Sequence, residues 1–145
     1  KKKILILVII FIIILIVILK LFVIKTNKII CASNGETKDL IITQKYIIKY
    51  DNNNIKNLKI IKTYKYMNDD LFKNFEEVYN NTLSNYESLK ISGLSYSGSI
   101  LKDTYKIELN INVSKISTKD FENLGFNKDL YSMKTALENQ GLKCN

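Results

Sequence analysis

The sequence predicts an α+β domain of order β-β-α-β-β-α, with its helices packed on one face of an antiparallel sheet, preceded by an N-terminal transmembrane helix. Three observations predict this class. Residues 4–24 are almost entirely apolar, residues 40–66 and 104–114 alternate apolar with polar side chains, and residues 71–89 repeat apolar side chains at steps of three and four. Alternation is typical of a strand with one buried face, and the longer repeat is typical of an amphipathic helix.

The first element is an apolar run from Ile4 to Ile24 that follows three lysines and is interrupted only by Lys20. As an α-helix with a rise of about 1.5 Å per residue, it would span roughly 30 Å, the thickness of the hydrocarbon core of a bilayer. We therefore expect the membrane to be a partner of the chain through Ile4 to Ile24. The predicted domains are a membrane anchor or signal segment over residues 1–25, a polar linker over 26–36 and an extracytoplasmic α+β domain over 37–145.

Three interpretations of the apolar segment stay open. An uncleaved signal anchor fits because the run is longer than the apolar centre of an ordinary signal peptide. A cleaved signal peptide would use the small residues at Cys31-Ala32-Ser33, and a lipoprotein would carry its lipid on Cys31, although Lys28-Ile29-Ile30 before it is a poor lipidation signal. The anchor predicts a single-pass protein of the cell membrane with its C-terminal domain outside the cytoplasm.

Most of the excess positive charge lies beside the apolar run. The chain has 22 basic and 14 acidic residues, for a net charge of +8. Six lysines flank or interrupt the run (Lys1, Lys2, Lys3, Lys20, Lys25 and Lys28), and without them 22 − 6 = 16 basic residues face 14 acidic ones. Because a nucleic-acid interface needs basic residues clustered on the domain, we expect no nucleic-acid partner.

Two cysteines, Cys31 and Cys144, lie near the two ends of the predicted domain. Two unrelated free thiols are one interpretation. A disulfide joining the ends of an exported domain is the other, and it would close a loop of 144 − 31 = 113 residues. Disulfides persist outside the cytosol, so the pairing also favours an extracytoplasmic domain.

The exported part begins with a predicted hairpin. Residues 40–50 and 58–66 each alternate with a period of two, and the Asp51-Asn52-Asn53-Asn54 segment between them suits a tight turn. The period then changes to a helical one over residues 71–89, with Asn68 as the expected N-cap. A helix of this kind is expected to lie on the sheet.

The second half of the chain predicts two further strands and a last helix, with no internal sequence repeat. Residues 94–99 and 104–114 predict two strands joined by a turn at Lys102 and Asp103, and the second of them has the cleanest alternation in the chain. Ser117 and Thr118 are expected to cap a short helical turn. Asn127 is expected to cap a last helix ending near Gln140, and Gly141 suits a left-handed C-cap.

Residues with catalytic potential are sparse. The chain has no His, so an ordinary catalytic triad and the common zinc sets are excluded, and we expect no metal site, no cofactor and no enzyme activity. Four carboxylates are candidates for an acid–base pair, but nothing in the sequence brings them together: Asp103, Glu108, Asp120 and Glu122. Six strand tyrosines are candidates for an aromatic ligand surface, although packing is the commoner role of such residues: Tyr46, Tyr50, Tyr64, Tyr66, Tyr96 and Tyr105.

The region from Glu36 to Lys143 resembles the YehR-like (DUF1307) family of small bacterial envelope lipoproteins. The hairpin and long helix carry this resemblance, together with Gly93-Leu94-Ser95-Tyr96, residues 104–111 and the ending at residues 137–142. The resemblance implies an envelope-attached α+β domain and supplies no catalytic residues. The chain departs from the family pattern in lacking a good lipidation signal before Cys31 and in carrying Cys144.

The first functional hypothesis is a non-catalytic binding or interaction domain of the cell envelope, which takes an unknown protein or small ligand on the sheet face that the helices leave open. The alternatives are an envelope enzyme that uses clustered carboxylates, or a cleaved secreted or lipidated form of the same domain. A purely structural element of a membrane complex ranks last, because the Ile4 to Ile24 run has no small residues for close helix packing.

Overall fold

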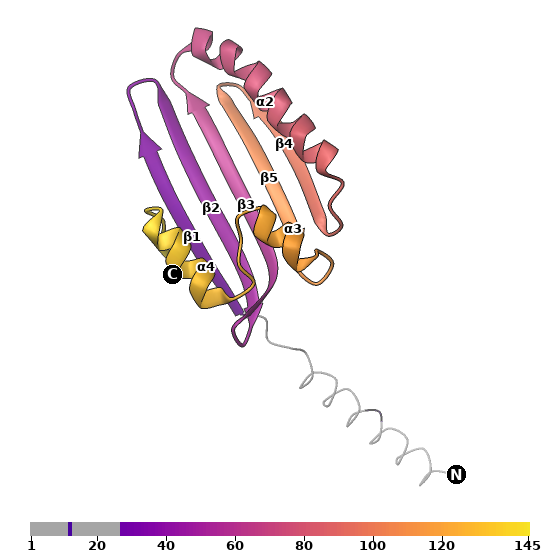
Figure 1. Ribbon diagram of the computed structural model, residues 1–145. Helices are drawn as coiled ribbons and strands as arrows, with labels where there is room; N and C mark the ends of the chain where they lie inside the picture. The colour runs from indigo at the N-terminus through magenta and orange to yellow at the C-terminus, as the bar shows by residue number, and fades with distance from the viewer. Residues whose placement is uncertain (1–11, 13–26) are drawn as a thin grey trace, which may run out of the picture.

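The computed structural model describes residue 12 and residues 27–145, and its centre is a six-stranded antiparallel sheet (Figure 1). The strand order is β4-β5-β3-β2-β1-β6. In chain order the elements are β1 (Asn27–Glu36), β2 (Leu40–Asp51), β3 (Asn54–Tyr66), α2 (Asp69–Leu89), β4 (Leu94–Leu101), β5 (Thr104–Asn112), α3 (Thr118–Asn123), α4 (Leu130–Asn139) and β6 (Lys143–Cys144).

The predicted hairpin over residues 40–66 is confirmed as β2 and β3. The two strands pair from Leu40 opposite Tyr66 to Asp51 opposite Asn54. Asn52 takes the left-handed backbone conformation at the turn, with φ of 53°, which Asn tolerates better than most residues. The pairing brings Tyr46 opposite Ile60 and therefore sets the apolar positions of both strands on one face.

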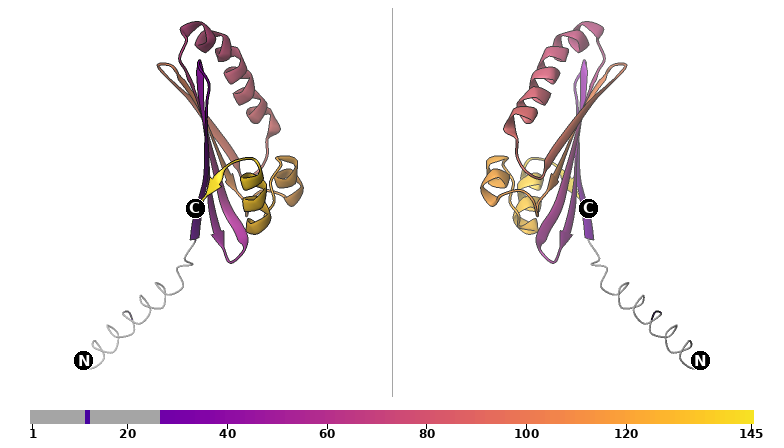
Figure 2. Two further views of the ribbon diagram at one scale, coloured as in Figure 1. Left: turned by 90° about the vertical axis from the view of Figure 1, so that its left-hand side faces the viewer. Right: turned by 90° about the vertical axis from the view of Figure 1, so that its right-hand side faces the viewer.

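The three helices of residues 27–145 (α2, α3 and α4) cover the same face of the sheet, which Figure 2 shows edge-on. Along β5 every second residue is buried, beginning with Tyr105, so this strand has one face in the core and one toward solvent. The buried strand residues on the helix side include Cys31, Ile48, Leu58 and Ile111. No helix of residues 27–145 lies on the other face of the sheet, which we call the open face.

Helix α2 lies diagonally over β3, β5 and β4. Asn68 caps it as predicted, because its side chain accepts a hydrogen bond of 2.9 Å from the backbone N–H of Asp70. Its apolar stripe meets an aromatic cluster formed by Tyr64, Tyr66, Phe72, Phe75, Tyr79 and Tyr105. Close approach to β4 depends on Gly98, where a Cβ atom would lie 2.6 Å from Leu83 Cδ1 and closer still to the hydroxyl of Tyr79.

The shorter helices α3 and α4 cover the other end of the sheet. Phe121 of α3 is fully buried, and Met133 and Leu137 of α4 pack in the same core. Ser117 caps α3, as predicted. The predicted cap of α4 is wrong by two residues: Asp129 accepts the N-terminal hydrogen bond, and Asn127 instead accepts one from the backbone N–H of Asp129.

The predicted fold class is wrong in its element order. Residues 26–36 are expected to be a linker, but Asn27–Glu36 form β1, and Lys143–Cys144 form β6 on its outer side. The result is mostly an antiparallel six-stranded sheet with a few helices. None of the helices in the described residues has the length and apolar character needed to cross a membrane. The Ile4 to Ile24 segment, predicted as a transmembrane helix, lies outside the described residues apart from Ile12.

Candidate ligand groove

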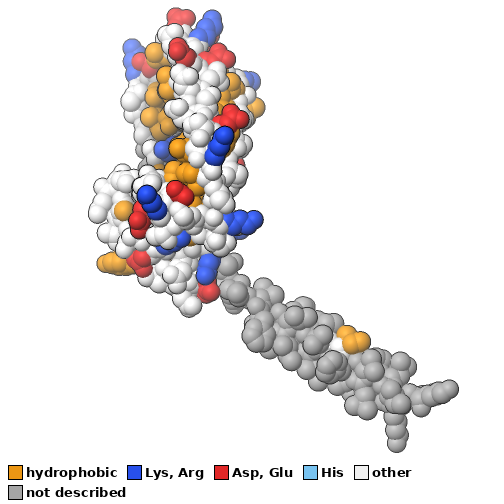
Figure 3. All heavy atoms as spheres, turned by 45° about the vertical axis from the view of Figure 1, so that its right-hand side comes forward, with side chains coloured by type: hydrophobic (Ala, Val, Ile, Leu, Met, Phe, Trp, Pro, Cys, Tyr) orange, Lys and Arg blue, Asp and Glu red, His pale blue; other side chains and the backbone are white. Residues whose placement is uncertain are grey.

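A hollow on the helix side of the sheet separates α2 from α3 and α4. We call it the interhelical groove. Its cavity has a volume of about 290 Å³. Strand side chains form the floor, Tyr86 of α2 forms one wall, and the loop after α3 and the end of α4 form the other. The lining residues are Tyr46, Ile60, Lys62, Tyr86, Leu94, Leu109, Ile111, Leu124, Gly125, Phe126 and Gln140. Figure 3 shows hydrophobic side chains along α2 and in this hollow.

The phenols of Tyr46 and Tyr86 line the groove, and the phenol of Tyr64 is near them. Tyr46 comes from β2, Tyr64 from β3 and Tyr86 from α2. Burial raises the pKa of Tyr46, and the nearby phenols of Tyr86 and Tyr64 raise it further. Burial, followed by the phenol of Tyr86, also raises the pKa of Tyr64. Both hydroxyls therefore stay protonated at neutral pH and are available to donate or accept hydrogen bonds.

Lys62 is the cation of this groove. It lies in β3 opposite Ile107 and Gln44, in phase with the buried Ile60, so its side chain is on the helix side of the sheet. In the described part of the chain, no carboxylate oxygen lies within 4.0 Å of its ammonium, whereas Lys59, Lys65 and Lys106 on the open face each have an acidic neighbour. A lysine on a mostly apolar floor without a countercharge is suited to an anionic ligand.

The acidic residues of α2 near the sheet are on its other flank. The pKa of Tyr105 on β5 is raised by burial and then by Glu76, and the pKa of Tyr96 on β4 is raised by burial and then by Glu87. Tyr105 and Tyr96 lie on β5 and β4, which are separated from β2 by β3. Among the described residues, neither carboxylate lies within 4.0 Å of the Lys62 ammonium.

An exposed apolar stripe runs along the side of α2 that faces β2. Leu71, Val78 and Leu89 are exposed and lie on one side of the helix, because 7 and 11 residues correspond to nearly whole numbers of turns. This side of α2 faces β2, because the adjacent Phe75 packs on Tyr64 of β3. On the opposite flank of the helix, Leu83 packs on Gly98 of β4. No described helix covers the part of β1 and β2 beyond it (Figure 1).

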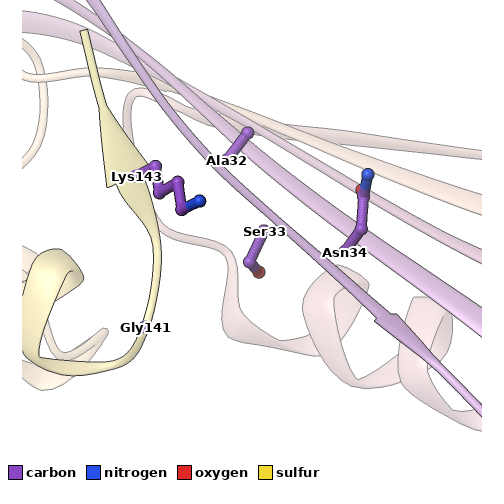
Figure 4. Close-up of a pocket in the computed structure, with 5 residues that line it drawn as sticks. All are labelled: Ala32, Ser33, Asn34, Gly141 and Lys143. Atoms are coloured by element: carbon purple, nitrogen blue, oxygen red, sulfur yellow. The ribbon is translucent and has the colours of Figure 1, made fainter.

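A second, shallower pocket lies at the edge of the sheet, where β6 ends and β1 continues. Figure 4 shows its lining by Ala32, Ser33, Asn34, Gly141 and Lys143. Its volume is about 320 Å³. Lys143 supplies its charged group. The pocket has no aromatic wall, so it offers a ligand less apolar surface than the interhelical groove.

The four candidate carboxylates lie in separate surroundings. Glu108 lies on the open face, 2.8 Å from Lys59 Nζ and 2.5 Å from Lys106 Nζ, and hydrogen bonds from these lysines lower its pKa. Asp103 lies 3.9 Å from Lys65, and Asp120 accepts a hydrogen bond from Ser117 on α3. Glu122 is also on α3. In the described residues, no three His, Cys, Asp or Glu side chains are grouped to hold a metal ion.

The candidate tyrosines do not form one surface. Tyr66 and Tyr105 are buried beneath α2, Tyr64 packs on Phe75 of the same helix, and Tyr50 packs against the core at the other end. Tyr46 lines the interhelical groove, and Tyr96 stacks on Tyr86 with ring centroids 6.4 Å apart. Sequence reasoning missed Lys62, Tyr86 and Gln140 as groove residues. The position of Lys62 in the apolar phase of β3 was the available signal.

The predicted disulfide is present. Cys31 and Cys144 are joined, with their Cα atoms 4.0 Å apart, and the described residues contain no free cysteine. They lie opposite each other in the pairing of β1 with β6. Hydrogen bonds between the backbones of Ile30 and Asn145 continue this pairing.

Comparison with known proteins identifies the fold alone. No family model matches the sequence, and no curated protein matches it. Among solved structures, the chain is similar to a protein from Streptococcus pneumoniae TIGR4 determined by NMR, with a TM-score of 0.54 and 14% sequence identity. The similarity covers 83% of this chain and 86% of that chain.

Proposed function

We propose that this protein is a non-catalytic, extracytoplasmic binding domain whose interhelical groove holds an anionic ligand with an apolar body. The observation that carries the proposal is the ammonium of Lys62, which faces an aromatic groove and has no acidic neighbour within 4.0 Å in the described residues. A carboxylate or sulfonate would accept hydrogen bonds from Lys62 and from the phenols of Tyr46 and Tyr86. The apolar body would lie against Leu109 and Phe126.

Two further observations support the location and the class. The Cys31–Cys144 disulfide is typical of an exported domain, and the resemblance to the YehR-like (DUF1307) family agrees with a place in the cell envelope. The separate partners of Glu108, Asp103 and Asp120 favour binding over acid–base catalysis.

Fluorescence titration tests the groove. The probe is 8-anilinonaphthalene-1-sulfonate, which combines aromatic rings with an anionic group, and N-phenyl-1-naphthylamine is its uncharged counterpart. Because charge-assisted hydrogen bonds contribute about 1.5–3 kcal/mol, we expect Lys62→Gln to weaken binding of the sulfonate at least tenfold. Binding of the uncharged dye should change little.

The matched control is Lys49→Gln. Lys49 is exposed on β2 and lies on the open face of the sheet. Its substitution changes the net charge by the same amount and leaves the groove intact. Equal loss of sulfonate binding in the two variants would show that the dye responds to net charge or to the apolar N-terminal segment, and would contradict the proposal.

A further inference from the structure

The two edges of the sheet differ. β6 covers part of the outer edge of β1 and is fixed there by the disulfide. β4 forms the other edge, and among the described residues no strand pairs with its outer side. Natural proteins usually protect such an edge with charged residues, proline, a bulge or a very short strand.

β4 has none of these protections. It runs for eight residues, Leu94–Leu101, and contains neither a charged residue nor proline. Its register with β5 is continuous from Leu94 opposite Ile111 to Leu101 opposite Thr104. Six of the eight residues are exposed, including Ile100 and Leu101, which expose 44% and 67% of their surface. The edge is therefore ready to pair with another strand.

The backbone pattern identifies the groups that point outward. The N–H of Asn112 donates to the carbonyl of Gly93, and these two residues continue the β4–β5 register. Hydrogen-bonded pairs alternate with non-hydrogen-bonded pairs along an antiparallel ladder. Ser95, Ser97 and Ser99 therefore bond to β5, whereas the backbone groups of Tyr96, Gly98 and Ile100 point away from the sheet. The carbonyl of Leu94 also points outward, but its N–H already donates to the carbonyl of Ile91.

We propose that β4 is a self-association edge, which pairs antiparallel with β4 of a second copy about a twofold axis at Ser97. In this register Tyr96 lies opposite Gly98 of the second copy, and Leu94 lies opposite Ile100 of the second copy. The backbone groups of Tyr96 and Gly98 then find partners, and the N–H of Ile100 donates to the carbonyl of Leu94 of the second copy. An aromatic residue opposite glycine is a favourable cross-strand pair. On the open face, Ser95 lies opposite Ser99 of the second copy, and the two Ser97 residues lie opposite each other.

The charges of α2 agree with this partner. Glu76 and Glu87 lie on the β4 side of the helix, because they are seven residues before and four residues after Leu83, which packs on Gly98 of β4, and Lys73 lies one turn before Glu76. Gly98 packs against Tyr79, so an axis at Ser97 passes near the middle of α2. A twofold rotation there turns the two α2 helices antiparallel and places Lys73 toward Glu87 of the second copy. An isologous contact of this kind closes on itself as a dimer.

Cross-linking through one added cysteine, in the full chain with its Cys31–Cys144 disulfide intact, tests the register. The two Ser97 residues form a non-hydrogen-bonded pair, in which Cα atoms are about 4.5 Å apart, a distance that a disulfide accepts. We expect Ser97→Cys to give a covalent dimer of twice the chain mass under mild oxidation. The matched control is Ser95→Cys, whose two copies would be about four strand residues apart, or roughly 13 Å, and it should remain uncross-linked. Equal cross-linking of both variants would contradict the proposed register.

Charge exchange tests the association without a new cysteine. Ser97→Lys and Ser97→Glu each place like charges opposite each other, which is destabilising, so each variant alone should dimerise about tenfold more weakly than the unsubstituted chain in sedimentation velocity. A mixture of the two variants should recover the dimer. Asn34→Lys on the exposed end of β1 is the control and should leave the association unchanged. A monomeric unsubstituted chain, or no recovery in the mixture, would overturn the proposal, and neither result depends on ligand binding in the groove.

Discussion

Cys31 and Cys144 lie directly opposite each other on β1 and β6, and their disulfide joins residues 113 positions apart in the sequence. Cys31 is fully buried among the residues that form the core beneath α3 and α4. The bond therefore links the first and last strands of the described domain and also belongs to its core. A link with this position should restrict the unfolded chain strongly.

Removal of the disulfide is expected to destabilise the domain without changing its fold. Replacement of both cysteines, as Cys31→Ala with Cys144→Ala, should lower the free energy of unfolding by about 2–5 kcal/mol. Urea denaturation followed by circular dichroism measures the change. Chemical reduction of the unsubstituted chain should give a comparable loss, and an unchanged midpoint in both experiments would contradict the expectation.

Gly98 and Gly35 form a matched pair for testing how closely α2 packs. A Cβ atom at Gly98 would lie 2.6 Å from Leu83 Cδ1 and would also collide with the buried Tyr79, whereas a Cβ atom at Gly35 meets no atom within 4 Å. Gly98→Ala should therefore cost about 1–3 kcal/mol of stability. Gly35→Ala should change stability by no more than about 0.5 kcal/mol. Equal effects in urea denaturation would show that α2 does not press on β4 as described.

Tyr105 and Tyr66 differ in the use of their hydroxyl groups. The hydroxyl of Tyr105 donates a hydrogen bond of 2.9 Å to the backbone carbonyl of Phe72. The buried hydroxyl of Tyr66 has no hydrogen-bond partner in the described structure. Tyr105→Phe should lower the free energy of unfolding by about 1 kcal/mol, because a hydrogen bond is lost. Tyr66→Phe should leave the free energy of unfolding unchanged or raise it. Thermal denaturation of the two variants compares them directly, and a larger loss for Tyr66→Phe would be contrary to this account.

Burial, with smaller effects from Tyr64 and Tyr105, raises the pKa of Tyr66 to about 12. Because the pKa of Tyr66 is higher in the folded chain than its ordinary value of 10.0, the neutral phenol stabilises the fold below pH 10.0. This contribution to the free energy of unfolding is lost as the pH rises toward 12. Tyr66→Phe should therefore lessen the loss of stability between about pH 10 and pH 12. Stability curves over this range test the expectation, and identical alkaline losses in the two proteins would contradict it.

Glu108 should contribute to the acid sensitivity of the domain. Hydrogen bonds from Lys106 and Lys59 lower its pKa below the ordinary value of 4.5. The ionised carboxylate therefore stabilises the fold above about pH 4.5, and this contribution is lost as the pH falls through the lower, folded pKa. Glu108→Gln should lower the free energy of unfolding by about 0.5 kcal/mol at pH 7, which is typical of a part-exposed ion pair. At low pH the substitution should leave the free energy of unfolding unchanged. Glu122→Gln, an exposed change on α3, is the control and should show neither effect.

The parts of the fold that the sequence predicts are those with a clear period. β2, β3, β5 and α2 each bury one regular face, so the spacing of their apolar residues identifies them. β1 escapes this reasoning because its second half, Asn34 to Glu36, is polar and glycine-containing. Its position is set by backbone pairing with β2 along its whole length, which no side-chain pattern records.

The candidate groove was only partly accessible from the sequence for a related reason. Tyr46 and Tyr64 stand out as strand tyrosines, and Lys62 is in phase with them on β3. Gln140 and Phe126, however, reach the same cavity from loops beside α4 and α3. The helix side of the sheet, rather than the open face, therefore carries the better candidate site, and this became visible only when α2 and the C-terminal helices were placed in space.

The aromatic cluster beneath α2 also provides an intrinsic optical signal. The chain contains no Trp, so tyrosine dominates its near-ultraviolet circular dichroism at the longest wavelengths. Tyr66, Tyr79 and Tyr105 pack as neighbouring rings, with Tyr105 at the centre of the group. Lifting α2 from the strands would free these rings and weaken the signal, while the far-ultraviolet spectrum of the sheet persisted. Recording both regions during a temperature ramp would therefore separate the release of this one helix from the melting of the whole domain.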